Sequence, residues 1–442
     1  MWISDKEINN LSLFVDVSHL SIVSQSVLSY IKTISPGSRL TKISNSIFSH
    51  TSNWLSALFF SNSIASFLPT NTECLAKTLR LALARKFEKY PSEGFEGLKP
   101  VSIYINSDNP YLPDLKFAVH SISLPQSCIK IVSCPSGSFD VAELEKIIEA
   151  DKSSSIVPLV LFADLGSSLT GGVDGSVKEL SELSEKHDVW LHLSGSLIAS
   201  FALAHNQAEQ TRNVRSMTLE LECLLGLPAC PTVLLYKAFP ALSQSVFEIE
   251  NEIKKIEAFP LWTVLQSVGR ERIINAIIQA FQSCRVIYDM ISKIKGFRIM
   301  SKAPLPIDDD AKNLPNVAVV LFQFDGCSVQ FDDETSDDKS PKKILDKESN
   351  ILYYSRLNSW LFQTLERDFP QVQLSLLDDP IHGTCIRFSP LELSMGEKVR
   401  SLLIPARIQL LIISLFRSQQ WKFLLNSTSF SKLNRTFYVQ RF

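Results

Sequence analysis

The chain has 442 residues, of which 45% are hydrophobic and 20% charged, so it is long enough to bury the cores of two packed domains. Its 44 Lys and Arg residues nearly balance its 46 Asp and Glu residues, which argues against nucleic acid or an anionic membrane surface as a partner. The eight cysteines are scattered through apolar segments without a C-x-x-C pair, a pattern that favours reduced thiols in the cytoplasm and predicts no metal site.

Neither end of the chain shows a membrane signal. The N-terminus carries charges where a signal peptide needs an apolar run. The most apolar late stretch, 402–416, is interrupted by Pro405 and Arg407 and is shorter than the roughly 20 residues that span a bilayer. We therefore expect no transmembrane span.

The first half of the chain alternates between strand and helix patterns. A helical segment is expected over 40–60. Four short apolar runs predict strands that are covered on both faces, at 101–105, 156–162, 189–193 and 232–236. Helical periodicity occupies 139–150, with Asp140 as its N-cap, and 176–187, which begins at Ser176. This alternation predicts an α/β fold with a mostly parallel sheet.

The second half changes character. Apolar residues at helical spacing predict one long amphipathic helix over 261–293. A small α+β unit is expected to follow, with strands at 316–324, 372–377 and 384–389, a helix at 353–367, and a polar, mobile loop at 332–343. The expected divisions are a helical segment 1–60, a large domain 61–258, an inter-domain helix 259–295, a small domain 296–395 and a divergent tail 396–442.

Four segments follow one shared pattern, namely 162–180, 189–196, 259–269 and, more weakly, 140–151. These segments resemble one family, the group II pyridoxal-phosphate-dependent decarboxylases. Segments 216–237 and 357–391 are similar to a divergent animal branch of that family. The resemblance implies the fold-type I architecture of pyridoxal-phosphate-dependent transferases, with a large mostly parallel sheet domain and a smaller C-terminal α+β domain. It also implies pyridoxal 5′-phosphate as cofactor.

The resemblance further implies a homodimer. Candidate interface residues are the apolar ones of segment 40–60, namely Ile47, Phe48, Trp54, Leu55, Leu58 and Phe59. The alternative is that these side chains pack within the monomer.

The position of the family's Schiff-base lysine is occupied by a cysteine. When Ser216 is aligned with the serine of the family motif, Glu222 falls on the family's histidine and Cys223 on its lysine. A thiol cannot form the internal aldimine that an amine forms. Cys223 is then either a reactive thiol or a small buried residue, and the second is favoured because no histidine or positive charge adjoins it in sequence. Lys237 lies one strand-length beyond the site and is not expected to substitute.

The family's aspartate, which holds the pyridine nitrogen, becomes Ser194. A hydroxyl can form a hydrogen bond but cannot stabilise a pyridinium by charge. His192, two positions earlier, matches a retained histidine of the family motif. It is either a cofactor contact or a strand-end histidine whose hydrogen bonds are satisfied within the protein. Ser167, His192, Ser194 and Cys223 are expected to converge on one cleft at the C-terminal ends of the strands.

The remaining cofactor contacts follow from the same resemblance. Thr70, Asn71 and Thr72 fall where the family binds phosphate at a helix start, although both glycines of that motif are absent. The favoured alternative is that Asn71 or Thr72 caps the helix. Tyr111 falls at the position of the family's stacking histidine. Ser167 and Ser168 fall in the conserved loop after the second predicted strand.

These substitutions indicate a decarboxylase-fold protein without decarboxylase chemistry, acting through binding or assembly. Covalent attachment of pyridoxal phosphate is not expected, and a non-covalent small-molecule ligand is compatible with the pattern. The alternative is an active pyridoxal-dependent carboxy-lyase acting on an amino acid. A third interpretation, a fragment or variant of such a protein, rests on the unmatched ends of the chain.

Overall fold

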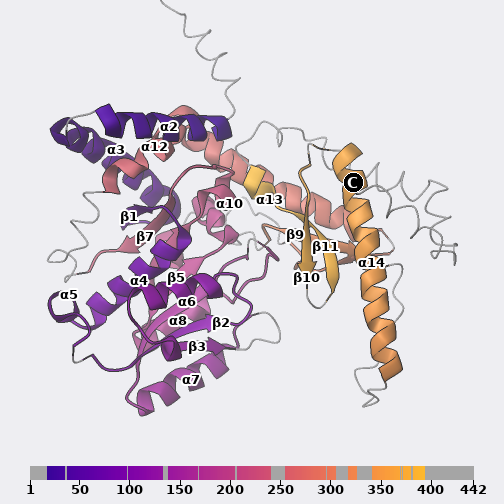
Figure 1. Ribbon diagram of the computed structural model, residues 1–442, viewed down its shortest axis with the longest axis horizontal. Helices are drawn as coiled ribbons and strands as arrows, with labels where there is room; N and C mark the ends of the chain where they lie inside the picture. The colour runs from indigo at the N-terminus through magenta and orange to yellow at the C-terminus, as the bar shows by residue number, and fades with distance from the viewer. Residues whose placement is uncertain are drawn as a thin grey trace, which may run out of the picture.

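Two β-sheets organise the chain (Figure 1). The computed structural model describes residues 17–34, 37–96, 98–132, 138–167, 169–204, 207–239, 254–294, 296–304, 317–325, 341–368, 370, 372–379 and 382–393. The predicted tail 396–442 lies outside these residues.

The larger sheet has seven strands in the order β1-β7-β6-β5-β4-β2-β3. Their bounds are β1 Ser63–Leu68, β2 Val101–Asn106, β3 Ile129–Val132, β4 Val157–Asp164, β5 Trp190–Ser194, β6 Val214–Leu219 and β7 Thr232–Lys237. All neighbours from β6 to β3 pair in parallel, whereas β7 runs antiparallel to both β1 and β6. The four predicted strands therefore lie in one mostly parallel sheet, as expected.

Helices cover both faces of this sheet. One face buries α4 (Asn71–Lys86), α6 (Leu112–Ser121) and the short 3-10 helix η1 (Gln126–Cys128). The other buries α7 (Val141–Ser153), α8 (Val177–His187) and the 3-10 helix η2 (Ser196–Leu203). The short remaining helices are α5 (Tyr90–Glu93), α9 (Gln207–Gln210), α10 (Leu221–Leu225), η4 (Lys255–Ala258) and η5 (Pro390–Leu393).

Capping explains where the first of the two predicted crossover helices begins. The carboxylate of Asp140 accepts the backbone N–H groups of Ala142 and Glu143 at 3.0 and 3.3 Å, so α7 starts at the predicted residue. Ser176 precedes α8 as expected, although its side chain makes no capping hydrogen bond.

The helix predicted over 261–293 is two helices, so that expectation is wrong in detail. α12 (Phe259–Val268) ends and α13 (Arg270–Ile291) begins at Gly269. Gly269 has φ +77°, a left-handed conformation that interrupts the helical hydrogen bonds. α13 then extends from the large sheet to the smaller one (Figure 1).

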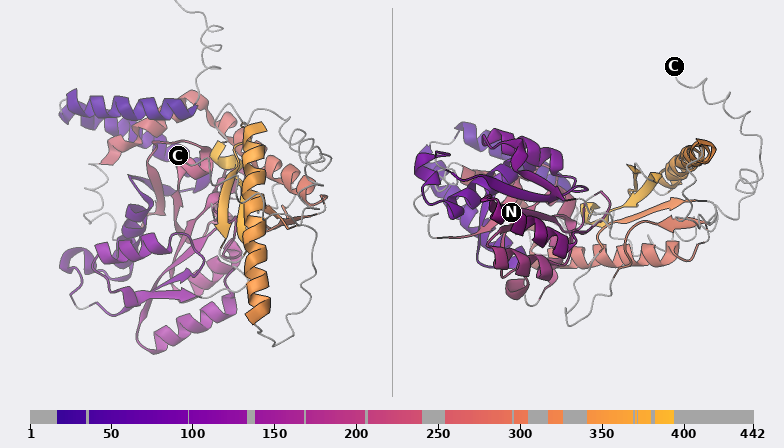
Figure 2. Two further views of the ribbon diagram at one scale, coloured as in Figure 1. Left: turned by 45° about the vertical axis from the view of Figure 1, so that its right-hand side comes forward. Right: turned by 90° about the horizontal axis from the view of Figure 1, so that it is seen from below.

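The smaller sheet is antiparallel, in the order β10-β11-β9-β8. Its strands are β8 Phe297–Ile299, β9 Val320–Phe324, β10 Ser375–Asp379 and β11 Gly383–Phe388. α13 and the long α14 (Pro341–Asp368) pack against this sheet (Figure 2). Residues 332–340 of the predicted loop lie outside the described residues, whereas 341–343 already belong to α14, a correction to the predicted helix start.

The N-terminal helices α2 (Val17–Ile34) and α3 (Gly37–Phe59) lie against α12 and η4 (Figure 1). Four of the candidate interface residues are buried inside the monomer, namely Ile47, Leu55, Leu58 and Phe59. Phe48 and Trp54 are half-buried against the same core. The alternative that segment 40–60 packs within the monomer is therefore confirmed.

Candidate functional site

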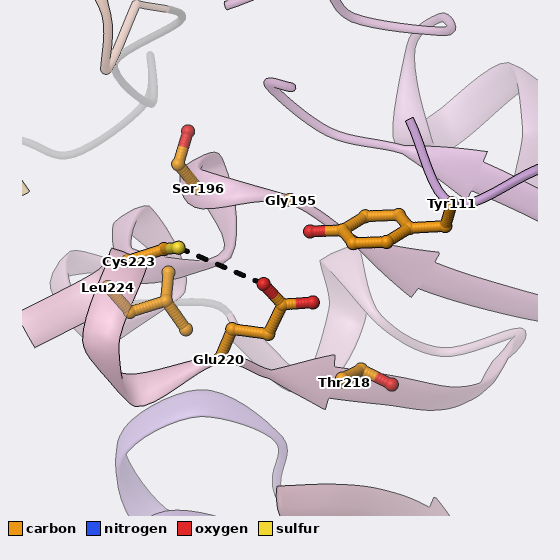
Figure 3. Close-up of a pocket in the computed structure, with 7 residues that line it drawn as sticks. All are labelled: Tyr111, Gly195, Ser196, Thr218, Glu220, Cys223 and Leu224. Carbon is orange, nitrogen blue, oxygen red and sulfur yellow. Dashed lines mark hydrogen bonds between the residues drawn. The ribbon is translucent and has the colours of Figure 1, made fainter. Parts of the chain in front are cut away.

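A small pocket lies at the C-terminal ends of β5 and β6 (Figure 3). Its volume is about 10 Å³, which is room for roughly one water molecule. The lining residues are Tyr111, Gly195, Ser196, Thr218, Glu220, Cys223 and Leu224. None of these seven residues has a side chain with an amino or guanidinium group.

Position 195 must be a glycine because the end of β4 approaches it closely. Its φ is +104°, and a Cβ atom there would lie 2.2 Å from Oδ1 of Asp164 and 2.5 Å from the carbonyl oxygen of Leu165. No larger side chain fits without moving the backbone. The carboxyl group of Asp164 therefore lies directly against one wall of the pocket.

Cys223 and Glu220 face each other across the pocket (Figure 3). The Cys223 thiol donates a hydrogen bond of 3.8 Å to Oε2 of Glu220. Burial, followed by the charge of Glu220, raises the pKa of Cys223 to about 12. At neutral pH the thiol therefore keeps its proton, and a protonated thiol is a poor nucleophile.

The small domain contributes to the surroundings of Cys223. α10, which carries Cys223, packs against η5. The Arg387 guanidinium forms a bidentate ion pair with the carboxylate of Glu392, a residue of η5. One of its two contacts is 3.1 Å long. Arg387 lowers the pKa of the Cys223 thiol, but burial and the carboxylates of Glu220, Glu392 and Glu222 outweigh it.

Tyr111 forms the opposite wall. It occupies the N-cap of α6, where its backbone N–H donates to Oδ1 of Asn109 at 2.9 Å. Its hydroxyl points toward Glu220 (Figure 3). Burial, followed by the carboxylates of Glu220 and Asp164, raises the pKa of the phenol. Burial likewise raises the pKa of Glu220.

Asp164 and Asp174 form a buried acidic pair beside the pocket. Oδ2 of Asp174 accepts the backbone N–H of Asp164 at 2.7 Å, and Oδ1 accepts the side-chain amide of Asn106 at 2.6 Å. Both carboxylate oxygens of Asp164 are buried and have no hydrogen-bond partner among the described residues. Burial first, then Asp174 and Glu220, raise the pKa of Asp164 well above its usual range.

His192 does not reach the pocket. It is fully buried and lies between two hydroxyls of β6, with Nδ1 2.8 Å from Ser216 Oγ and Nε2 3.2 Å from Thr218 Oγ1. Trp190 donates its indole N–H to the same Ser216 oxygen at 2.7 Å, so Ser216 joins the two aromatic side chains of β5. Burial lowers the pKa of His192 to about 3. The structure thus places it as a satisfied strand histidine.

The expected convergence of four residues on one cleft is only partly observed. Ser194 is buried and paired in register with Asp164, but it is not a lining residue. Ser167 also lies away from the lining, where its hydroxyl accepts the backbone N–H of Leu169 at 3.3 Å. Of the four, only Cys223 lines the pocket. Ser168 lies outside the described residues.

The candidate phosphate-binding residues mostly serve the start of α4. Thr70 is the N-cap, and its hydroxyl accepts the Glu73 N–H at 3.3 Å. The expectation that Asn71 or Thr72 would cap is therefore wrong in the residue, although a cap is present. Thr72 instead donates to Asp114 at 2.6 Å, and the side-chain amide of Asn71 is buried with no partner among the described residues.

Lys237 lies away from the pocket. Its Nζ donates to the carbonyl oxygens of Thr211 and Arg212 at 2.6 and 2.7 Å, just before the N-terminal end of β6. The pocket lies at the C-terminal end of that strand, so Lys237 does not replace the missing amine.

Sequence reasoning missed Asp164, Glu220, Thr218 and Ser196. Asp164 was detectable in principle, because a charged residue ends the otherwise apolar run of β4. Glu220 had no such signal, since the segment after β6 contains several acidic and apolar residues.

Elsewhere, Glu145, Glu149 and His187 bring potential ligand atoms within 4.8 Å of one another. This cluster is an ion-pair network that joins α7 to α8. Lys186 lies 2.6 Å from the Glu145 carboxylate, and Lys152 donates to Nδ1 of His187 at 3.0 Å. The Glu145 carboxylate and Nδ1 of His187 are therefore already engaged by lysine side chains.

Comparison with known proteins places the chain in a family. The pyridoxal-dependent decarboxylase conserved domain matches residues 116–218, and the PDXDC1-like central domain matches 317–411. The putative pyridoxal-dependent decarboxylase domain-containing protein 2 of Homo sapiens is 31% identical over 394 residues, which cover 86% of this chain and 80% of the relative. The chain belongs to the pyridoxal-dependent decarboxylase family.

Members of this family differ in length. Pyridoxal-dependent decarboxylase domain-containing protein 1 of Mus musculus is 31% identical over 86% of this chain, but the match spans only 48% of that relative. The animal branch suggested by segments 216–237 and 357–391 is thereby confirmed. Membership implies pyridoxal phosphate as the cofactor of the family.

Solved structures of low sequence identity share the fold. The crystal structure of mouse CSAD has a TM-score of 0.64 at 15% identity, covering 90% of this chain and 80% of that one. The structure of Oryza sativa TDC with PLP and tryptamine has a TM-score of 0.63 at 15% identity, covering 89% and 81%. The predicted fold-type I architecture is therefore confirmed. Within the described ranges, no helix is both long and apolar enough to cross a membrane.

Proposed function

We propose that this protein is a pseudoenzyme of the pyridoxal-dependent decarboxylase family, which acts by binding or assembly. The observation that carries the proposal is the Cys223–Glu220 hydrogen bond, at the position that aligns with the Schiff-base lysine of the family. A protonated thiol cannot supply the amine on which the covalent chemistry depends.

The residues around the pocket do not fit a phosphorylated pyridoxal. The cofactor requires an amine for its aldehyde and hydrogen-bond donors for its phosphate. The pocket instead presents the carboxyl group of Glu220, with that of Asp164 behind Gly195. At the start of α4, the hydroxyls of Thr70 and Thr72 are engaged with Glu73 and Asp114. These residues therefore support no catalytic step through this cofactor.

Borohydride labelling tests the proposal. The purified chain is incubated with pyridoxal phosphate, reduced with borohydride and digested for peptide mapping. We expect weak labelling spread over several exposed lysines, and the same pattern in Cys223→Ser. Stoichiometric labelling of a single lysine, together with carbon dioxide release from an amino acid, would instead establish the alternative, an active carboxy-lyase.

For assembly, we propose a homodimer that uses the outer face of α2. This face exposes large apolar side chains at helical spacing, namely Ile22, Val23, Val27, Tyr30 and Ile34. No Asp, Glu, Lys or Arg occurs in α2 before Lys32. Interface centres are depleted of charge in this way, whereas ordinary exposed helix faces are charged.

Sedimentation velocity tests the dimer. We expect a dimer for the unmodified chain and a monomer for the double substitution Val23→Glu and Val27→Glu. A matched control is Phe117→Glu on α6, where an apolar side chain at least as exposed lies on a different surface. A monomeric unmodified chain, or dissociation by the control alone, would refute this assignment.

We also propose a cytoplasmic location. The six described cysteines, all of which are free thiols, support it, because the cytoplasm keeps thiols reduced.

A further inference from the structure

The small domain contacts the large one through η5. Leu391, a residue of η5, is fully buried in the hydrophobic core of the large domain, together with Leu224 of α10 and Ile277 of α13. Figure 1 shows η5, at the yellow end of the described chain, between these two helices. η5 therefore connects the small sheet directly to the helix that carries Cys223.

An ion pair holds η5 on the small sheet. Arg387, on β11, is 9% exposed, and its guanidinium donates to both carboxylate oxygens of Glu392 in η5. The same guanidinium donates to Oγ of Ser375 on β10 at 3.3 Å, so it joins η5 to two strands. A bidentate pair fixes orientation as well as distance, whereas a single 3-10 turn has few hydrogen bonds of its own. The position of η5 on α10 therefore depends on Arg387.

While η5 is docked, the pocket is too small for anything larger than water. Its volume of about 10 Å³ holds roughly one water molecule, and Cys223 and Leu224 of α10 form part of its lining. α10 contacts η5 through a close-packed core, so a shift of α10 that enlarges the pocket has to move or break that contact. A larger occupant therefore requires a change at η5.

We propose that η5 is a releasable latch: the Arg387–Glu392 ion pair holds it on α10, and its release frees α10 and exposes the Cys223 thiol. Release is a rearrangement at a packed contact between domains, which has two discrete states because packed cores do not deform continuously. The inference adds regulation to the proposed function and rests on it, because a site that acts by binding must admit its ligand.

Alkylation of the folded chain with iodoacetamide, followed by peptide mapping, measures the exposure of each thiol. We expect Arg387→Gln and Glu392→Gln each to accelerate alkylation of Cys223 by about tenfold, because either change breaks the ion pair. Cys230 is a partly buried thiol between α10 and β7, and it is the matched control. Its rate should be the same in both variants as in the unmodified chain.

The two substitutions separate release of η5 from a direct effect of charge. The carboxylate of Glu392 raises the pKa of Cys223 and the guanidinium of Arg387 lowers it. Through charge alone, Glu392→Gln would therefore accelerate alkylation and Arg387→Gln would slow it, since the thiolate is the nucleophile. Release predicts acceleration by both. Glu222→Gln removes another carboxylate that raises the same pKa but lies outside the ion pair, so it should accelerate alkylation much less than Glu392→Gln.

Two results would overturn the latch. One is slower alkylation of Cys223 in Arg387→Gln combined with faster alkylation in Glu392→Gln. The other is an equal rate in Glu392→Gln and Glu222→Gln. If either occurs and borohydride still labels no single lysine, only this inference is lost, whereas selective lysine labelling would refute the proposed function.

Unfolding of a variant is detected in the same experiment, because Cys74 and Cys284 are fully buried. If these thiols react in parallel with Cys223, the unmodified chain in urea decides instead. Release predicts that alkylation of Cys223 accelerates at urea concentrations where Cys74 and Cys284 stay protected, because a local opening needs less exposure of surface than unfolding. If Cys223 keeps its basal rate until those two thiols react, η5 is not a releasable latch.

Discussion

Asp164 and Ser194 are opposite each other on the parallel strands β4 and β5, at the C-terminal ends of both. Ser194 aligns with the aspartate of the family motif, so the chain lacks a carboxylate at that position and has one on the adjacent strand. A carboxyl group on β4 has Gly195 and the Asp174 loop as neighbours. The carboxyl group of Asp164 therefore has neighbours different from those of a carboxylate at position 194.

Replacing Asp164 should stabilise the protein at neutral pH. Its folded-state pKa is raised, so its contribution to stability is fully present below the unfolded pKa of about 3.9 and is lost as pH rises toward the folded value. The neutral Asp164→Asn avoids this loss. We expect it to be more stable than the unmodified chain by about 1–3 kcal/mol near pH 8, and by less near pH 4, in urea unfolding.

A matched buried acid should behave in the opposite way. Asp151 accepts the Tyr104 hydroxyl at 2.8 Å and pairs with Lys130 at 3.5 Å. Asp151→Asn should therefore destabilise the protein, because it weakens interactions that the carboxylate makes. If both substitutions destabilised the chain equally at every pH, Asp164 would not be an uncompensated acid.

Restoring the family aspartate alone should be harmful. Ser194→Asp would place a second carboxylate opposite Asp164 in a buried position. Like charges in such a site raise each other's pKa and oppose folding. We expect a lower urea midpoint for Ser194→Asp at neutral pH, recovered in part by adding Asp164→Asn. Equal midpoints for Ser194→Asp and the unmodified chain would contradict the predicted repulsion.

Restoring the lysine alone should not restore aldimine formation. In Cys223→Lys the new amine would lie next to Glu220, the carboxylate that now accepts the thiol. An ion pair with Glu220 would keep the amine protonated, and a protonated amine does not attack an aldehyde. We expect no aldimine absorbance on adding pyridoxal phosphate to this variant. Cys223→Lys with Glu220→Gln removes the ion pair and is the comparison that separates this cause from a closed pocket.

Acid should weaken the fold partly through His192. Its pKa is lowered to about 3 by burial, so below the unfolded value of about 6.5 the unfolded state binds a proton that the folded state does not. Stability is then lost at about 1.4 kcal/mol per pH unit as pH falls through this window.

The variant His192→Gln should show a shallower decline of the urea midpoint between about pH 6 and pH 4. Its absolute stability should be lower, because it disturbs the hydrogen bonds with Ser216 and Thr218. His120→Gln, at an exposed position of α6, is the control and should leave the slope unchanged. A steep decline that persists in His192→Gln would assign acid sensitivity to other groups.

Local sequence patterns were sufficient to predict most of the large domain. Apolar runs gave the positions of β2, β4, β5 and β7, and Asp140 marked the start of α7, because periodicity and capping are properties of neighbouring residues. β6 was missed because Arg215, Ser216 and Thr218 interrupt its apolar pattern. These residues face neighbours that are distant in sequence, and Ser216 bonds Trp190 and His192 on β5. The helix break at Gly269 was not predicted, and only the observed backbone angle revealed it.

For the site, alignment by residue type identified Cys223 at the lysine position and Tyr111 at the stacking position, and both line the pocket. Only the tertiary structure showed that Glu220 accepts the thiol, that Asp164 lies behind Gly195, and that His192 is enclosed by β6. Sequence order determines which side chains a strand carries. The distance between strand ends determines which of those side chains are in contact. Burial away from water determines which acidic groups keep their protons.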